Sequence, residues 1–347
     1  MNIEVKKLSG SEVEISGEIP AEEFEKSWDE ALKQIGEKTR LDGFRPGKAP
    51  EKVLIEKVGE GEILETAAEL CLKKTWPKIV AENKIEALGQ PEIVITKLAR
   101  QNPLGFKIKT AVLPEVKLAD YKKIAGEVMS GPGEEITVAE KEIEGALEYL
   151  RKSRAKNPAG GGSSSGGGGE LPELNDEFAK SLGSFENLEA LKKNMRENIK
   201  LEKTIKAREK KRMELLDLVA ASSQIEVPAI LVEAEKEKMF SELKGSLDGM
   251  GLSWEHYLDH IKKTQEDLAK EWTGEAEKRV RYGLTLREIA RTEKIEVAEA
   301  ELEKETEYFL SRYLPEERAK LDLKRIKDYA YGIVRNEKVF KLLENHG

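Results

Sequence analysis

Residues 43–50 of this 347-residue chain read Gly43-Phe44-Arg45-Pro46-Gly47-Lys48-Ala49-Pro50. Glycine permits backbone conformations that other residues avoid and proline restricts them, so the stretch predicts a shaped loop that is not helical. Its one aromatic and two cationic side chains suit contact with an acidic or RNA-bearing surface. Residues 38–57 hold six Lys or Arg against three Asp or Glu, although the whole chain has a net charge of −8. The alternative is an ordinary turn with Phe44 tucked into the core.

The segments around this loop predict an α+β domain with an antiparallel sheet and packed helices. Alternation of apolar and charged residues predicts two strands within residues 1–19, then strands at about 92–98 and 104–113. Apolar residues at helical spacing predict helices starting near Pro20 and at about 51–57 and 60–83.

After the last predicted strand, the sequence predicts an irregular segment, then a helix, then a Gly/Ser run. Residues 114–136 predict extended, irregular chain, and the capping box Thr137-x-x-Glu140 predicts the start of a helix. Residues 160–169 read GGGSSSGGGG. Natural linkers are seldom this pure, so we interpret the run as an engineered flexible linker with a mean span of about 17 Å.

Beyond about residue 175 the pattern predicts an all-α domain. Apolar residues recur at helical spacing over six segments, at about 188–221, 228–247, 253–271, 273–293, 297–313 and 315–344. Hydrophobic residues make up 39% of the chain and charged residues 36%. A hydrophobic share this low suits an elongated, multi-domain molecule.

One helical stretch is strongly basic. Lys200 to Arg212 contains seven cations and two glutamates, a net charge of +5. Ile199 and Ile205 are expected to supply its buried side. A solvated helix face is the first interpretation, and nucleic-acid binding is the alternative.

Residues with metal-binding or redox chemistry are few. His256 and His260 are four residues apart on a predicted helix, but the zincin glutamate is missing and no cysteine is near, so a solvated or half-buried pair is expected. Cys71 is the only cysteine, which excludes an intramolecular disulfide, and its apolar neighbours predict a buried thiol. We expect no metal and no cofactor. The absence of a signal peptide or transmembrane run predicts a cytoplasmic protein with no membrane partner.

Some apolar residues of the predicted helices are candidates for binding exposed apolar polypeptide segments. Methionine and aromatic side chains adapt to varied partners, although core packing is the alternative for each. The candidates are Met239, Phe240, Leu243, Met250, Leu252 and Trp254.

The loop at residues 43–50 resembles the ribosome-binding signature of the trigger factor family, Gly-Phe-Arg-x-Gly-Lys-x-Pro, at all six fixed positions. Residues 225–228 and 279–292 resemble segments of the same family, and the similarity covers nearly the whole chain apart from the linker. The resemblance implies a chaperone that docks near the ribosomal exit tunnel and binds nascent or unfolded polypeptides. It implies that the loop contacts a ribosomal protein and nearby rRNA through Phe44, Arg45 and Lys48. Gly43 and Gly47 would shape the loop.

The chain departs from the family in one respect, because the FKBP-like prolyl isomerase domain that members carry is absent. The predicted organisation is a ribosome-binding domain at 1–113, an extended linker and arm helix at 114–159, the Gly/Ser linker at 160–169 and a helical client-binding domain at 170–347. We therefore expect an ATP-independent holdase and not an enzyme, with a homodimer left open. The alternatives are isomerase activity as in the intact family, or a helical RNA-binding or scaffold protein. The net charge of −8 and the lack of sustained heptads argue against the latter.

Overall fold

The computed structural model describes residues 2–39, 44, 47, 49–131, 135–154, 171–318 and 320–346. The chain forms two compact units, Met1–Ala119 with Ser222–Glu293, and Asp120–Ala221 with Lys294–Gly347. Each unit therefore takes residues from both sides of the Gly/Ser run, which itself lies outside the described residues. The predicted ranges 1–113, 114–159 and 170–347 group the chain differently and stay a prediction about functional domains.

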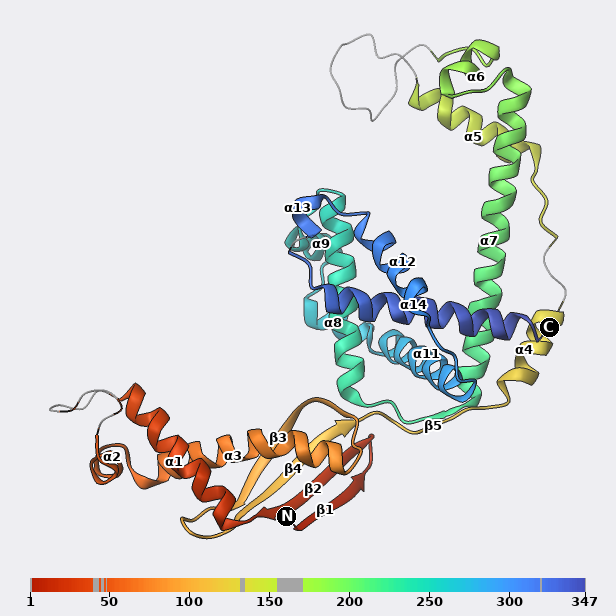
Figure 1. The fold of residues 1–347 in the computed structure, drawn as a ribbon. Coiled ribbons are helices and arrows are strands. Elements are labelled where there is room, and N and C mark those ends of the chain that lie inside the picture. The colour runs from red at the N-terminus through yellow and green to blue at the C-terminus, as the bar shows by residue number, and fades with distance from the viewer. Residues whose placement is uncertain are drawn as a thin grey trace. The chain divides into compact units, whose positions relative to one another are not determined.

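The first unit contains a four-stranded antiparallel sheet in the order β1-β2-β4-β3 (Figure 1). Its strands are β1 (Asn2–Leu8), β2 (Glu12–Ile19), β3 (Ala87–Lys97) and β4 (Leu104–Val112). Ile15 lies opposite Ile108 in the register, and both are fully buried. The other face of the sheet carries cross-strand ion pairs such as Lys109 with Glu12 at 2.8 Å. The alternation in sequence thus separates a core face from a solvated face.

Three helices follow β2 in this unit, α1 (Ala21–Lys38), α2 (Glu51–Val58) and α3 (Glu60–Glu82). Phe24, Trp28 and Ala31 recur at helical spacing along α1, and all three are fully buried in one core with Ile15 and Ile108. The α+β prediction for this part of the chain is confirmed.

The remaining elements of the first unit are a short two-stranded sheet and four helices. They are β5 (Val116–Lys117), β6 (Gln224–Ile225), α8 (Ala229–Gly249), α9 (Trp254–Ile261), α10 (Gln265–Glu271) and α11 (Thr273–Thr292). The predicted helix at 253–271 is therefore two helices. The chain breaks at Lys262, whose φ is +54°, and Thr264 then caps α10 by accepting a hydrogen bond from the Asp267 amide.

The second unit is helical. Its described helices are α4 (Tyr121–Ser130), α5 (Glu140–Ser153), α6 (Asp176–Leu182), α7 (Leu188–Ser222), α12 (Glu299–Leu310), α13 (Pro315–Arg318) and α14 (Leu323–Glu344). One apolar cluster joins α5, α6 and α7 through Ile143, Leu147, Ala179 and Leu191. The predicted all-α character beyond residue 175 is confirmed apart from the two residues of β6.

Three further local predictions are wrong. The predicted helix at 315–344 is two helices, α13 and α14. Residues 114–136 are not wholly irregular, because α4 begins after Asp120, whose carboxylate accepts a hydrogen bond from the Lys123 amide. Helix α5 begins after Ala139 and not at Thr137. Alanine has no capping oxygen, so only half of a capping box forms, in which Glu142 accepts a 2.9 Å hydrogen bond from the Ala139 amide.

Candidate functional site

The loop at residues 43–50 connects α1 to α2, and the structure describes its residues Phe44, Gly47, Ala49 and Pro50. Gly43, Arg45 and Lys48, three of the predicted contact or shape residues, lie outside the described part. The side chain of Phe44 is 41% exposed. The alternative in which Phe44 is tucked into the core is therefore wrong, and the aromatic ring is available for contact.

Gly47 has a backbone conformation that favours glycine. Its φ is +77°, and a β-carbon at this position would lie 3.3 Å from Cγ of Glu37. The Gly47 amide donates a 2.8 Å hydrogen bond to the Gly36 carbonyl, which ties the loop back to the last turns of α1. Gly36 is buried, and a β-carbon there would meet Leu54 of α2 at 3.4 Å. Two glycines thus allow the chain to turn tightly between the helices.

Gly47→Ala should destabilise this turn by about 1–2 kcal/mol, because alanine must adopt a left-handed conformation and press on Glu37. Thermal denaturation would measure the loss. Gly61→Ala is the matched control, since the structure leaves open space around that glycine of α3. The control should leave the midpoint unchanged or slightly raised. A Gly47→Ala protein as stable as the control would show that the loop relaxes freely.

The first turn of α2 is anchored by residues that are distant in sequence. The Trp28 indole donates to the carboxylate of Glu51 at 3.4 Å, and the Arg100 guanidinium lies 4.7 Å from the Trp28 ring centroid. Arg100 also pairs with Glu51 at 2.9 Å. Trp28 is fully buried, so the anchor is part of the core. Helical spacing of apolar residues predicts the helix that carries Trp28, but nothing local in the sequence links Trp28 to Glu51 or Arg100.

Lysines flank the loop on both helices. Lys38 in the last turn of α1 and Lys52 in the first turn of α2 are exposed, and neither pairs with a carboxylate among the described residues. These side chains keep the local positive charge that the sequence predicts. A partner with negative charge would therefore meet cations that other described side chains do not neutralise.

The six candidate client-binding residues do not share one exposed surface. Met239 and Phe240 are buried at 7% and 5% exposure, whereas Met250 and Leu252 are 64% and 47% exposed in the turn between α8 and α9. The others, Leu243 and Trp254, are half-buried. Phe240 packs edge-on against Trp254 with 5.9 Å between ring centroids and against Trp272 at 4.8 Å. The buried members support an apolar tip that Met250 and Leu252 present to solvent. Their binding of clients stays a prediction.

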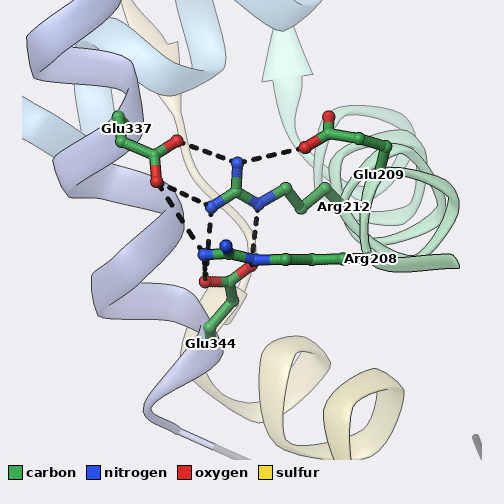
Figure 2. Close-up of polar contacts among 5 residues, drawn as sticks. All are labelled: Arg208, Glu209, Arg212, Glu337 and Glu344. Carbon is green, nitrogen blue, oxygen red and sulfur yellow. Dashed lines mark hydrogen bonds and ion pairs between the residues drawn. The ribbon is translucent and has the colours of Figure 1, made fainter. Parts of the chain in front are cut away.

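The basic stretch of α7 is matched by carboxylates. Arg208 and Arg212 both bind Glu337 and Glu344 of α14 (Figure 2). Elsewhere on the helix Lys203 pairs with Glu142 at 2.7 Å, and Lys206 pairs with Glu202 at 2.5 Å. Lys203, Arg208 and Arg212 thus pair with carboxylates outside the stretch, so the net charge counted along the sequence overstates the charge that a partner would meet.

One expectation for this stretch is wrong. Ile199 packs partly against the cluster of α5, α6 and α7, but Ile205 is 53% exposed. Ile205 follows the part of α7 that packs in that cluster and precedes the contact of Arg208 with α14. The buried side that we expected Ile205 to supply for this stretch therefore does not form.

His256, His260 and Cys71 are not gathered into a metal site in the described part of the chain. His256 and His260 are exposed, and the described residues contain no group of three or more His, Cys, Asp or Glu that could hold a metal ion. Cys71 is a buried thiol, as predicted, and burial raises its pKa. Within the described ranges, no helix is both long and apolar enough to cross a membrane.

Comparison with known proteins assigns the chain to a family. Residues 1–150 match the family model of bacterial trigger factor protein, and residues 187–344 match that of the trigger factor C-terminus. Trigger factor of Carboxydothermus hydrogenoformans is 29% identical, with 99% of each chain covered. That of Caldicellulosiruptor bescii is 26% identical over 99% of this chain and 97% of its own.

The alignment with the Caldicellulosiruptor bescii protein spans 431 residues, whereas this chain has 347, so that protein has residues without a counterpart here. A solved structure described as a trigger factor chaperone in folding and assembly covers 99% of both chains, with a TM-score of 0.59 and 20% identity. The fold thus agrees with the sequence matches, and the two family models leave the Gly/Ser run between them. This chain belongs to the trigger factor family of chaperones.

Proposed function

We propose that this chaperone is an ATP-independent holdase of the cytoplasm that docks on the ribosome through residues 43–50. It binds nascent and unfolded polypeptides near the exit tunnel, and a ribosomal protein with nearby rRNA is the docking partner. The observation that carries the proposal is the complete loop signature on an anchored α1–α2 turn with an exposed Phe44. In this proposal residues 1–113 dock, and residues 170–347 bind clients.

Sedimentation of the purified chain with ribosomes through a sucrose cushion tests the docking. We expect the chain in the ribosome pellet at low salt. Its share should fall as salt is added, since exposed cations such as Lys38 and Lys52 are screened. A chain that stays in the supernatant at low salt would refute the docking.

Client binding should use several apolar patches, so one substitution should weaken it only in part. Met250→Glu places a charge on an exposed side chain and should leave the fold intact, whereas Phe240→Glu would charge a buried position. Light scattering of a denatured client diluted into buffer measures the effect. We expect suppression by the wild-type chain at near-stoichiometric amounts without ATP, and weaker suppression by Met250→Glu.

Val94→Glu is the matched control, because Val94 is 53% exposed on β3 and lies outside the candidate tip. This control should suppress aggregation as the wild type does. No suppression by the wild type at severalfold excess would contradict the holdase function. Complete loss in Met250→Glu would instead indicate one dominant pocket.

The chain should not catalyse prolyl isomerisation, because the matches to the family models cover residues 1–150 and 187–344 and include no isomerase domain. Proline-limited refolding of a model protein should run at its uncatalysed rate, over tens to hundreds of seconds at 25 °C. Stopped-flow fluorescence with catalytic amounts of the chain measures this. A refolding rate that rises in proportion to the chain's concentration would contradict the expectation.

A further inference from the structure

Two arginines of α7 and two glutamates of α14 form a closed lattice of ion pairs (Figure 2). Arg212 donates to Glu337 at 2.8 and 3.0 Å and to Glu344 at 2.7 Å. Arg208 holds the same Glu344 in a two-pronged contact at 2.8 and 2.6 Å. Glu344 is the last residue of α14, so the final turn of that helix is fastened to α7.

The side chains of this lattice are more buried than those of the surface ion pairs in the same unit. The side chain of Arg212 is only 7% exposed and that of Glu344 is 18% exposed, against 74% and 63% for Lys206 and Glu202. The Phe340 ring covers the Arg212 guanidinium at 4.9 Å. A charge as buried as Arg212 must keep its partners, because removing one leaves the other unpaired away from water.

The end of the chain meets two helices at this junction. Lys211 of α7 donates to the Gly131 carbonyl, directly after α4, at 3.1 Å. The backbone of His346 packs so closely on α4 that a β-carbon at Gly126 would lie 3.2 Å from its carbonyl oxygen. Residues 344–346 therefore contact both α7, through Glu344, and α4, through His346.

An exposed apolar pair lies on the same face of α7 as the two arginines. Leu201, Ile205, Arg208 and Arg212 are spaced by four, three and four residues, so they lie along one face of the helix. Leu201 is 60% exposed and Ile205 is 53% exposed. The two side chains lie one to three turns before the arginines that α14 holds.

We propose that the last turn of α14 is a latch, in which Glu344 and Glu337 hold Arg208 and Arg212 and thereby fix the direction in which α7 presents Leu201 and Ile205. Loss of that turn opens the latch and removes the contacts of Glu344 from the middle of α7, where the pair of Lys203 with Glu142 remains. The consequence for clients rests on the proposed holdase function, because a fixed helix offers a preorganised apolar pair.

The latch stays closed over the ordinary pH range. Hydrogen bonds from Arg208, together with Arg212, lower the pKa of Glu344 to about 2, and Arg212 also lowers that of Glu337. The charged groups that face these carboxylates are Arg208, Arg212 and Lys341. The stabilisation from a carboxylate with a depressed pKa is fully present above its ordinary pKa of 4.5 and is lost progressively as the pH falls from there to about 2. Opening therefore requires a change in the chain and not a mild acidification.

Hydrogen exchange of α7 in the full chain tests the latch. We expect Glu344→Gln, and separately removal of residues 344–347, to speed exchange of the amides at 201–212 by roughly 30-fold or more. Glu202→Gln is the matched control, since it breaks the exposed Lys206 pair on the same helix, and it should leave these amides unchanged. Amides of α3, in the other unit, report the general integrity of the fold.

Unchanged exchange at 201–212 in both latch variants would overturn the proposal, as would an equal effect in Glu202→Gln. If exchange rises throughout Asp120–Ala221, the variant Arg208→Lys distinguishes the latch from general unfolding. Lysine keeps the positive charge but cannot make the bidentate contact with Glu344. Its effect should be smaller and confined to 201–212, and a null effect there would overturn the latch. Aggregation assays with the same variants report separately on client binding, so a failed holdase assay with faster exchange would count against the proposed function alone.

Discussion

Replacing Phe44, Arg45 and Lys48 together with alanine is expected to abolish co-sedimentation with ribosomes and to leave the circular dichroism spectrum unchanged. Phe44 is 41% exposed in a loop, and substitutions of exposed residues usually change the free energy of unfolding by at most about 0.5 kcal/mol. On the ribosome the same ring and the two cations would be the central contacts, and truncating such contacts commonly removes most of the binding energy. The measurement is the ribosome-bound fraction in a sucrose-cushion pellet.

The end of α5 offers a matched control for this triple variant. Tyr149→Ala, Lys152→Ala and Arg154→Ala together also remove one exposed aromatic ring and two cations, and Tyr149 is 73% exposed. This second triple variant should pellet like the wild type, which separates the loop from a general effect of charge. Normal pelleting of the loop variant would show that the docking assignment is wrong.

The elements of this fold follow from the sequence where a pattern is local and long. Alternation in β2 and β4 marks a core face, and Ile15 and Ile108 do meet there. Phe24, Trp28, Leu32 and Ile35 follow at helical spacing in the sequence, and all four pack in or against the core that α1 faces. Such patterns need no knowledge of the partner, because each apolar side chain only has to lie on one face of its own element.

Short elements and long-range partners could not be predicted in the same way. Helix α4 is ten residues long, and its buried residues Tyr121 and Ala125 mark too short a stripe to distinguish from extended chain. The partners of Arg212 lie 125 and 132 residues away, so its burial is invisible in a local charge count. The exposure of Ile205 has the same cause, because an apolar residue at helical spacing is buried only if another element reaches it.

The loop at residues 43–50 was predicted as a motif, but the contacts that hold it between α1 and α2 were not. The sequence indicates that glycines shape the turn, and the structure adds the close packing of Gly36 and Gly47 that lets α1 and α2 meet. The pairing of Arg100 with Glu51 over Trp28 depends on three segments that only the folded sheet brings together. The family was thus readable from the sequence, whereas the contacts that hold the loop between α1 and α2 come from tertiary packing.

Trp28→Ala is expected to weaken both the core and the docking, although no loop residue changes. Truncating a fully buried tryptophan costs about 3–5 kcal/mol, because apolar contacts are lost and a cavity remains. The same substitution removes the indole that contacts Glu51 and lies under Arg100, so the first turn of α2 loses its anchor. Exchange of the β2 and β4 amides should become at least roughly 100-fold faster, and ribosome pelleting should fall.

Two further variants divide these effects. Trp28→Phe keeps an aromatic ring in the core and removes the indole N–H, so stability should fall less than with alanine while the contact to Glu51 is lost. Trp254→Ala truncates a half-buried tryptophan in the aromatic group of α8 and α9, and it should leave ribosome pelleting unchanged. Full pelleting by a folded Trp28→Ala protein would show that the loop keeps its shape without the anchor. Docking would then depend only on the exposed side chains of the loop and on the tight turn that Gly36 and Gly47 allow. The conformation of Gly47 would in that case not depend on Trp28.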